Sequence, residues 1–173
     1  MTDRVWIPVA DADAWALATT VDVRDGDLVT LRRDGTDHTV QMTRAEREAL
    51  PAAVLDEAVD DLTALSSVHD ATMLDTLRRR HAADEIFTSI GNVVISVNPF
   101  KPVPSCTPDS IARLSQQGEA APPHVARVAS VAYRKMTGDD GSPPRAQSIL
   151  ISGESGAGKT DACNDAETAP SSS

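Results

Sequence analysis

Apolar and polar residues alternate along the N-terminal part of the chain. Four short runs rich in Val, Thr and Trp carry this pattern, at residues 5–8, 15–23, 27–33 and 37–42. Asp-Gly pairs follow the second and the third run, and Asp-Gly between strand-like runs is a strong hairpin signal. The pattern predicts a small antiparallel sheet, with Trp6 and Trp15 in its core rather than on a peptide-binding surface.

Apolar residues three and four positions apart predict helices farther along the chain. The first covers residues 43–59, where Thr43 and Glu46 fit a capping box and Pro51 breaks the helix in two. Three more helices are predicted at residues 70–81, 109–117 and 122–137. The arginines that end the first of these three suit the helix dipole and are expected to be solvated. The apolar stripe of the last helix is expected to pack against a sheet.

Three apolar runs between these helices predict strands. Residues 86–90 and 93–97 are separated by Gly91 and Asn92. The second run, VVISV, is β-branched and almost wholly apolar, which is typical of a strand covered on both faces. Residues 148–152 form the third run and are predicted to be a buried strand.

The stretch that follows this third run carries the clearest chemistry. It reads GESGAGKT and matches the phosphate-binding pattern G-x-x-x-x-G-K-[ST] in full. Its glycines let the backbone turn tightly, so that several N–H groups can point at the same phosphates. Lys159 would reach the β- and γ-phosphates, and the Thr160 hydroxyl would coordinate Mg²⁺. We therefore interpret the stretch as a phosphate cradle rather than a flexible turn, formed by Gly153, Glu154, Ser155, Gly156, Ala157, Gly158, Lys159 and Thr160.

Composition restricts the partners and the compartment. The 173 residues allow one domain, or one domain plus a small module. A net charge of −10 argues against nucleic acid or an anionic membrane as the partner. Cys106 and Cys163 show neither metal-site spacing nor a disulfide framework, so a reducing cytosol is expected. No signal peptide and no apolar run long enough to span a bilayer are visible in the sequence.

Several motifs together resemble one family, the myosin heavy-chain motor head. Residues 60–65 (DDLTAL) and 86–91 (IFTSIG) resemble the run before its nucleotide pocket. Residues 97–101 (VNPFK) resemble its purine-binding loop, and residues 122–136 resemble the helix after that loop. Residues 147–160 match its P-loop signature almost letter for letter. These motifs occur in the family's order and at its spacing.

The resemblance covers roughly residues 4–160 and implies a fold class. That class is an α/β P-loop NTPase, a myosin motor head truncated after the P-loop and preceded by a small SH3-like β module. The implied domains are the SH3-like module at 1–45, the N-terminal part of the motor domain at 46–160 and a polar tail at 161–173.

The resemblance also implies ligands and site residues. The cofactors would be ATP and Mg²⁺, and the full-length family acts on actin filaments in the cytoplasm and cytoskeleton. In the purine-binding loop, Asn98, Pro99 and Lys101 would contact the nucleotide. This loop usually ends in a tyrosine near the adenine. Cys106 stands at that place here, so weaker packing against adenine is expected.

The residues after Thr160, DACNDAETAPSSS, show no apolar period. At most one or two helical turns followed by disorder are expected there. The family's switch loops and actin-binding region are absent from this sequence, so we expect the full-length motor to hydrolyse ATP while this chain alone does not. We also expect the chain to be marginally stable.

Two other functions remain open. The chain could be a truncated, non-motor product that binds nucleotide weakly or not at all. It could also be an unrelated P-loop kinase or ATPase. The latter is disfavoured because small P-loop kinases usually carry the motif near the N-terminus, with the acceptor site downstream.

Overall fold

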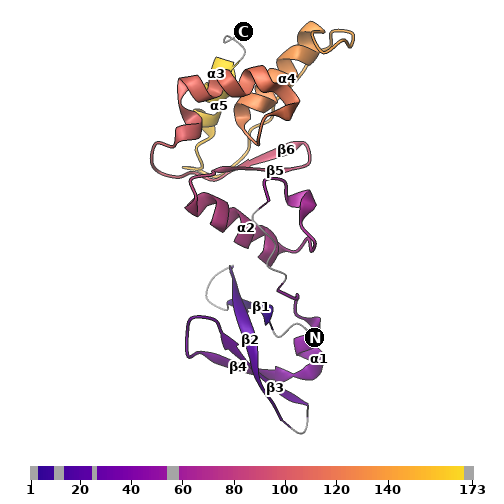
Figure 1. The fold of residues 1–173 in the computed structure, drawn as a ribbon, viewed down its shortest axis with the longest axis vertical. Coiled ribbons are helices and arrows are strands. Elements are labelled where there is room, and N and C mark those ends of the chain that lie inside the picture. Colours follow the sequence, from indigo (N-terminus) through magenta and orange to yellow (C-terminus); the bar gives the residue numbers. More distant parts are fainter. Residues whose placement is uncertain (1–3, 10–13, 25–26, 54–58, 170–173) are drawn as a thin grey trace. The chain divides into compact units, whose positions relative to one another are not determined.

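The computed structural model describes residues 4–9, 14–24, 27–53 and 59–169 (Figure 1). The chain forms two compact units. The first contains residues 1–57 and 65–75, and the second contains residues 58–64 and 76–173. The limits of the three domains expected from the sequence stay predictions.

A four-stranded antiparallel sheet forms the body of the first unit. Its strands are β1 (Arg4–Val9), β2 (Ala14–Arg24), β3 (Leu28–Arg33) and β4 (Thr39–Thr43), paired in chain order. The pairing places Trp6 opposite Leu17 and Leu31 opposite Val40. The predicted small antiparallel sheet is therefore confirmed, although the first Asp-Gly pair lies outside the described residues.

Both faces of β1 contribute to a core. Val5 and Ile7 pack with alternate residues of β2 and β3, among them Leu31, which is fully buried. Trp6 points to the other face and packs with Ala53 and Ala71. Trp6 is only 4% exposed, and Trp15 is half-buried beside it. The expectation that the two tryptophans are core residues is confirmed.

The predicted capping box begins helix α1 (Arg44–Ala49). The Thr43 hydroxyl accepts a hydrogen bond from the Glu46 N–H at 3.2 Å, and the Glu46 carboxylate accepts one from the Thr43 N–H at 2.8 Å. These bonds lower the pKa of Glu46 below its ordinary value. The helix ends before Pro51, and residues 54–58 of the predicted continuation lie outside the described residues.

Helix α2 (Asp70–Ala82) agrees with its prediction, but one of its terminal arginines is not solvated. Arg80 is 8% exposed. Its guanidinium donates hydrogen bonds to the Phe87 carbonyl at 2.9 Å and the Thr88 hydroxyl at 3.0 Å. It thereby satisfies polar groups of the neighbouring strand, which sequence pattern alone does not reveal.

The second unit contains a two-stranded hairpin, β5 (Phe87–Ile90) and β6 (Val93–Ser96). Gly91 makes the turn at a φ of +58°, in the left-handed region that glycine adopts readily. The hairpin was predicted correctly. The prediction that both faces of its second strand are covered is wrong. Val93 is 60% exposed, and Val94 and Ile95 are only half-buried.

Three helices pack together in the same unit: α3 (Pro108–Gln117), α4 (Val125–Thr137) and α5 (Lys159–Thr168) (Figure 1). Thr107 caps α3, and Gly138 ends α4 with a φ of +84°. Of the stripe predicted for α4, Ala129 packs with α3 and α5 and Val125 packs beside the β5–β6 hairpin, whereas Tyr133 and Met136 are exposed. No helix within the described ranges is long and apolar enough to cross a bilayer.

Helix α5 is longer than expected. It has 10 residues, close to three turns, where one or two turns were predicted. Ala166 and Ala169 pack on a cluster that includes Ala126 and Ala129 of α4. Small residues let two helices approach closely without a large apolar face, and this is the signal that the sequence interpretation missed.

The buried strand predicted at 148–152 is wrong. Residues 143–154 form neither helix nor strand. Leu150 is 92% exposed and Ile149 is 44% exposed. An apolar run favours an extended backbone, but a strand also needs a neighbour for its N–H and C=O groups. Among the described residues, the ladders of the second unit comprise β5 and β6 alone.

Candidate phosphate-binding site

The loop at 153–160 has a backbone that depends on glycine. Gly156 and Gly158 have φ values of +81° and +86°, which other residues rarely adopt. Gly158 is also the residue that precedes the first turn of α5. Turns that alternate between right- and left-handed conformations can orient successive N–H groups toward one anion.

Lys159 connects the two ends of this loop. Its ammonium donates hydrogen bonds to the carbonyl oxygens of Gly153 at 2.9 Å and Glu154 at 2.7 Å. A turn bond of 3.2 Å from the Ala157 N–H to the Glu154 carbonyl lies inside the same ring. The loop is therefore closed by its own lysine, with a positive charge at its rim.

Close packing restricts the first position of the loop. A Cβ atom added to Gly153 would lie 3.2 Å from the Ala157 Cβ, tighter than ordinary contacts. A side chain at Gly153 would therefore require Ala157 to move by a few tenths of an ångström.

Thr160 lies in the first turn of α5 and is exposed. The first N–H groups of a helix have no partner within the helix, and the N-terminus carries partial positive charge. Thr160 therefore places a hydroxyl and these amide donors at the same accessible point. This combination suits a phosphate together with a cation held by the hydroxyl.

Asn98 reaches the loop from a distant part of the chain. Its side-chain NH₂ donates a 2.7 Å hydrogen bond to the Gly156 carbonyl. Its side-chain oxygen accepts a 2.9 Å hydrogen bond from the Phe100 N–H, which shapes the turn. A ring nitrogen of His81 lies 3.3 Å from the Asn98 carbonyl oxygen. The structure thus brings the two sequence motifs together at Asn98.

The neighbours of Asn98 have other contacts. Lys101 makes an ion pair with Asp84, and Pro99 is half-buried in the turn. Phe100 is 86% exposed with a φ of +51°. Sequence reasoning did not single out Asp84 or His81 as supports of this turn, because neither belongs to a motif.

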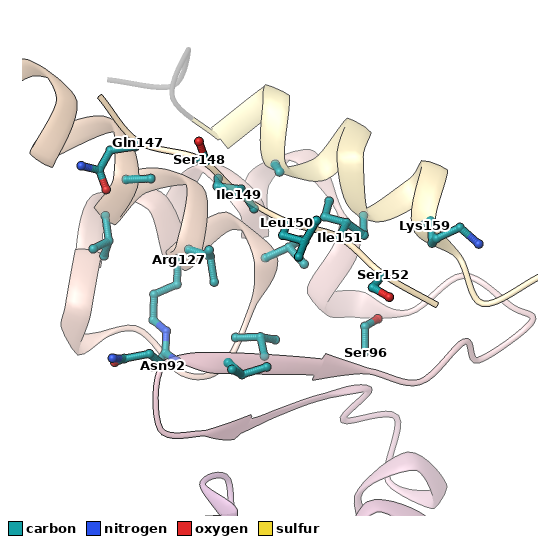
Figure 2. A pocket seen from close by; sticks show the side chains of 18 of the residues that line it. Asn92, Ser96, Arg127, Gln147, Ser148, Ile149, Leu150, Ile151, Ser152 and Lys159 are labelled. Carbon is teal, nitrogen blue, oxygen red and sulfur yellow. The ribbon is translucent and has the colours of Figure 1, made fainter. Parts of the chain in front are cut away.

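A hollow of about 1060 Å³ lies beside the loop (Figure 2). Its apolar lining comes from β6, α4 and the segment before the loop, and includes Val94, Val128, Val131, Ile149, Leu150 and Ile151. Figure 2 shows the segment running from Gln147 to Ser152, with Lys159 at the start of α5 beyond it. Cationic side chains line the hollow as well, among them Arg127, Lys135 and Lys159.

Comparisons with known proteins agree on one family. The profile of the family described as myosin head (motor domain) matches residues 59–166. Myosin-15 of Arabidopsis thaliana is 38% identical over 164 residues, which cover 92% of this chain and 10% of that protein. The high molecular weight form of myosin-1 of Acanthamoeba castellanii is 39% identical over 129 residues, 74% of this chain and 8% of that protein.

A third relative matches a shorter part of the chain. Unconventional myosin-Ia of Gallus gallus is 45% identical over 106 residues, which cover 61% of this chain and 10% of that protein. The chain spans about a tenth of the length of these relatives. The family profile covers well over half of the residues, so this chain belongs to the myosin head (motor domain) family.

Proposed function

We propose that this chain binds ATP with Mg²⁺ through the loop at 153–160. The observation that supports this most is the ring closed by Lys159, whose ammonium lies 2.9 Å and 2.7 Å from two loop carbonyls at the N-terminus of α5. A preformed loop with a lysine at its rim can bind phosphate without the entropic cost of ordering a flexible segment first.

Each residue has a proposed role. Lys159 neutralises the β- and γ-phosphates and stabilises the charge that develops during transfer. Thr160 supplies one oxygen ligand to Mg²⁺, and the backbone from Gly153 to Gly158 supplies amide donors. Asn98, Pro99 and Lys101 form the edge that faces the base, where Cys106 replaces the usual tyrosine.

The finer fold assignment is also a proposal. The four antiparallel strands and the buried Trp6 support an SH3-like module. The glycine-dependent loop that opens α5 supports a P-loop NTPase arrangement.

For the whole protein, we propose actin-activated ATP hydrolysis that drives movement along filaments in the cytoskeleton. Family membership supports this activity. Hydrolysis also needs a second protein ligand for Mg²⁺ and a group that orients the attacking water molecule. We therefore propose that these 173 residues bind nucleotide without turnover. The alternative is weak or no binding, and the exposed Leu150 next to the loop favours it, because poor anchoring would leave the loop less ordered.

Binding of a fluorescent ATP analogue in the presence of Mg²⁺ tests the proposal. We expect Lys159→Ala to weaken binding by more than about tenfold, because a charge-assisted contact to phosphate is lost. Arg32→Ala is the control, since Arg32 is an exposed cation on β3 of the first unit. The proposal fails if the unmodified chain does not bind, or if both variants bind equally well. Phosphate release that depends on Mg²⁺ and on Lys159 would contradict binding without turnover.

A further inference from the structure

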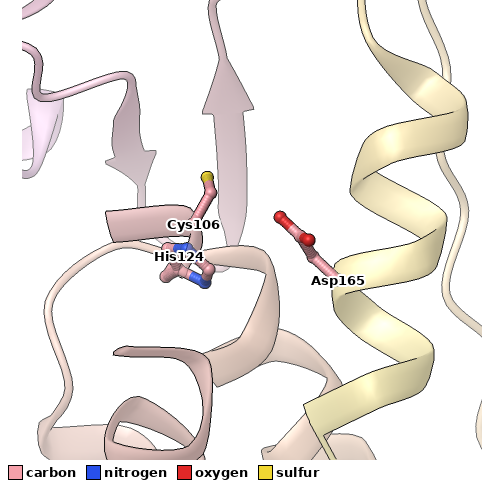
Figure 3. Close-up of side chains that lie close together, drawn as sticks. All are labelled: Cys106, His124 and Asp165. Atoms are coloured by element: carbon pink, nitrogen blue, oxygen red, sulfur yellow. The ribbon is translucent and has the colours of Figure 1, made fainter. Parts of the chain in front are cut away.

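Three metal-ligating side chains from separate segments meet in the second unit: Cys106, His124 and Asp165 (Figure 3). Their candidate ligand atoms all lie within 4.8 Å of one another. Cys106 ends a 3-10 turn, His124 immediately precedes α4, and Asp165 lies on α5. Because the three are far apart in sequence, spacing rules for metal sites do not detect them.

The cluster has one buried member, His124, and two half-buried members, Cys106 and Asp165. His124 is 1% exposed, and its ring meets the ring of Phe87 edge-on with centroids 4.3 Å apart. Burial raises the pKa of the Cys106 thiol, and the Asp165 carboxylate adds to this effect. Burial also raises the pKa of Asp165 and lowers that of His124 to about 4. These three polar groups are kept together at a cost in solvation, which a bound cation would offset.

One atom of this cluster lacks a hydrogen bond. His124 Nδ1 accepts a 3.0 Å hydrogen bond from the Ala126 N–H and so caps α4. His124 Nε2 is buried and makes no hydrogen bond of good geometry within the described part of the chain, although the Ser105 backbone lies close enough to raise the pKa of the ring slightly against the effect of burial. A buried ring nitrogen without a good partner is costly and uncommon in native proteins, and a cation bound in place of its proton would remove this cost.

We propose that Cys106, His124 and Asp165 bind a Zn²⁺ ion. Zinc is bound by cysteine sulfur, histidine nitrogen and carboxylate oxygen, and a site with three protein ligands leaves a fourth position for water. The thiolate and imidazole favour zinc over Mg²⁺ and Ca²⁺, which prefer oxygen ligands. Zinc bond lengths place tetrahedral ligand atoms roughly 3.5 Å apart, so the side chains would have to close by roughly 1 Å.

The protons can be accounted for. Zinc binding displaces the thiol proton of Cys106, since the bound sulfur is a thiolate. The neutral His124 ring carries its proton on Nε2, because Nδ1 accepts from Ala126. Coordination through Nε2 moves this proton to Nδ1 and ends the hydrogen bond with Ala126. One proton is released in total, and one capping hydrogen bond is exchanged for a zinc bond.

The site would join segments that also carry the phosphate loop. Asp165 lies on the helix that begins at Lys159, and Cys106 follows the turn that contains Asn98. A bound zinc would thus fasten α5 to the segment after the purine-binding loop. The site requires no nucleotide, so its test is independent of the proposed function.

Titration of the chain with Co²⁺ tests this site, because Co²⁺ adopts tetrahedral geometry and absorbs light where Zn²⁺ does not. We expect saturable binding of one Co²⁺ per chain, with a thiolate-to-cobalt charge-transfer band that added Zn²⁺ abolishes. Cys106→Ser should remove the band. Cys163→Ser is the matched control and should keep it, because Cys163 is exposed on the same helix as Asp165. Asp165→Asn should weaken Co²⁺ binding by more than about tenfold.

Three results would overturn the proposal: no charge-transfer band in the unmodified chain, a band that survives Cys106→Ser, or a band lost in Cys163→Ser. Circular dichroism of each variant checks that it is folded. If Cys106→Ser disrupts folding, the Asp165→Asn variant tests the site instead, because Asp165 is half-exposed and its replacement disturbs the fold less. Unchanged Co²⁺ affinity in Asp165→Asn would also exclude the site.

Discussion

The sheet of the first unit and the segment at 148–152 contain similar apolar runs with different outcomes. Each strand from β1 to β4 pairs with the strand next to it in the chain, and the alternate side chains form one core. Residues 148–152 are as apolar as β1, yet they are not a strand, and Leu150 is 92% exposed. An apolar run becomes a strand only where a partner strand is available.

The largest expected effect compares how much stability is lost when a leucine in each region is replaced by alanine. Leu31→Ala should lower the free energy of unfolding of the first unit by about 3 kcal/mol, because a fully buried leucine leaves a cavity. Leu150→Ala should change stability by less than about 0.5 kcal/mol, since most of this side chain already faces solvent. Urea unfolding followed by tryptophan fluorescence and by circular dichroism measures both.

Tryptophan fluorescence reports on the first unit alone, because the chain contains only Trp6 and Trp15. Circular dichroism also follows the unfolding of the helices in the second unit. A large loss of stability in Leu150→Ala would mean that residues 148–152 are buried in solution and that the comparison is wrong.

The same comparison explains how much of the structure the sequence predicts. The hairpin turn at Gly91, the Thr43 cap and the Gly138 helix end are local features, and each was predicted correctly. The misses depend on contacts between distant residues. Arg80 is buried because β5 presents acceptors to it, and α5 is held by alanines of another helix.

The residues of the candidate site also fall into a part that the sequence predicts and a part that depends on contacts between distant residues. The loop at 153–160 was visible as a motif, because its chemistry needs glycines and a lysine at fixed spacing. The contact between Asn98 and Gly156 was not predicted, and the cluster around His124 was not visible at all. Side chains that meet through folding leave no spacing pattern in the sequence.

A second, smaller effect sharpens the comparison at the loop of residues 153–160. Asn98 supplies the hydrogen bond that ties this loop to the second motif, at 2.7 Å from the Gly156 carbonyl. Asn98→Ala should weaken binding of the fluorescent ATP analogue about threefold to tenfold, as expected for one lost hydrogen bond. The tryptophan-monitored unfolding of the first unit should not change. Asn92→Ala, at the exposed tip of the β5–β6 turn, is the control. Equal losses of affinity in both variants would show that Asn98 does not hold the loop.

The smallest expected effect concerns the cap of α1, which depends on neighbouring residues alone. Glu46 accepts hydrogen bonds from the N–H and the hydroxyl of Thr43, and these lower its pKa from the ordinary value of 4.5. A lowered folded-state pKa means that the ionised carboxylate stabilises the fold fully above this ordinary value. The contribution is lost as the pH falls through the lowered pKa. Glu46→Ala should therefore shift the urea midpoint slightly at neutral pH, and the difference from the unmodified chain should shrink in acid.

Thr43→Ala removes the cap hydroxyl itself and should cost about 1 kcal/mol. Thr43→Ser should behave like the unmodified chain, because serine caps equally well. A difference between Glu46→Ala and the unmodified chain that stays constant from neutral to acidic pH would show that the carboxylate charge contributes nothing to this cap. Local hydrogen bonds would then not suffice to explain why α1 begins where its sequence predicts.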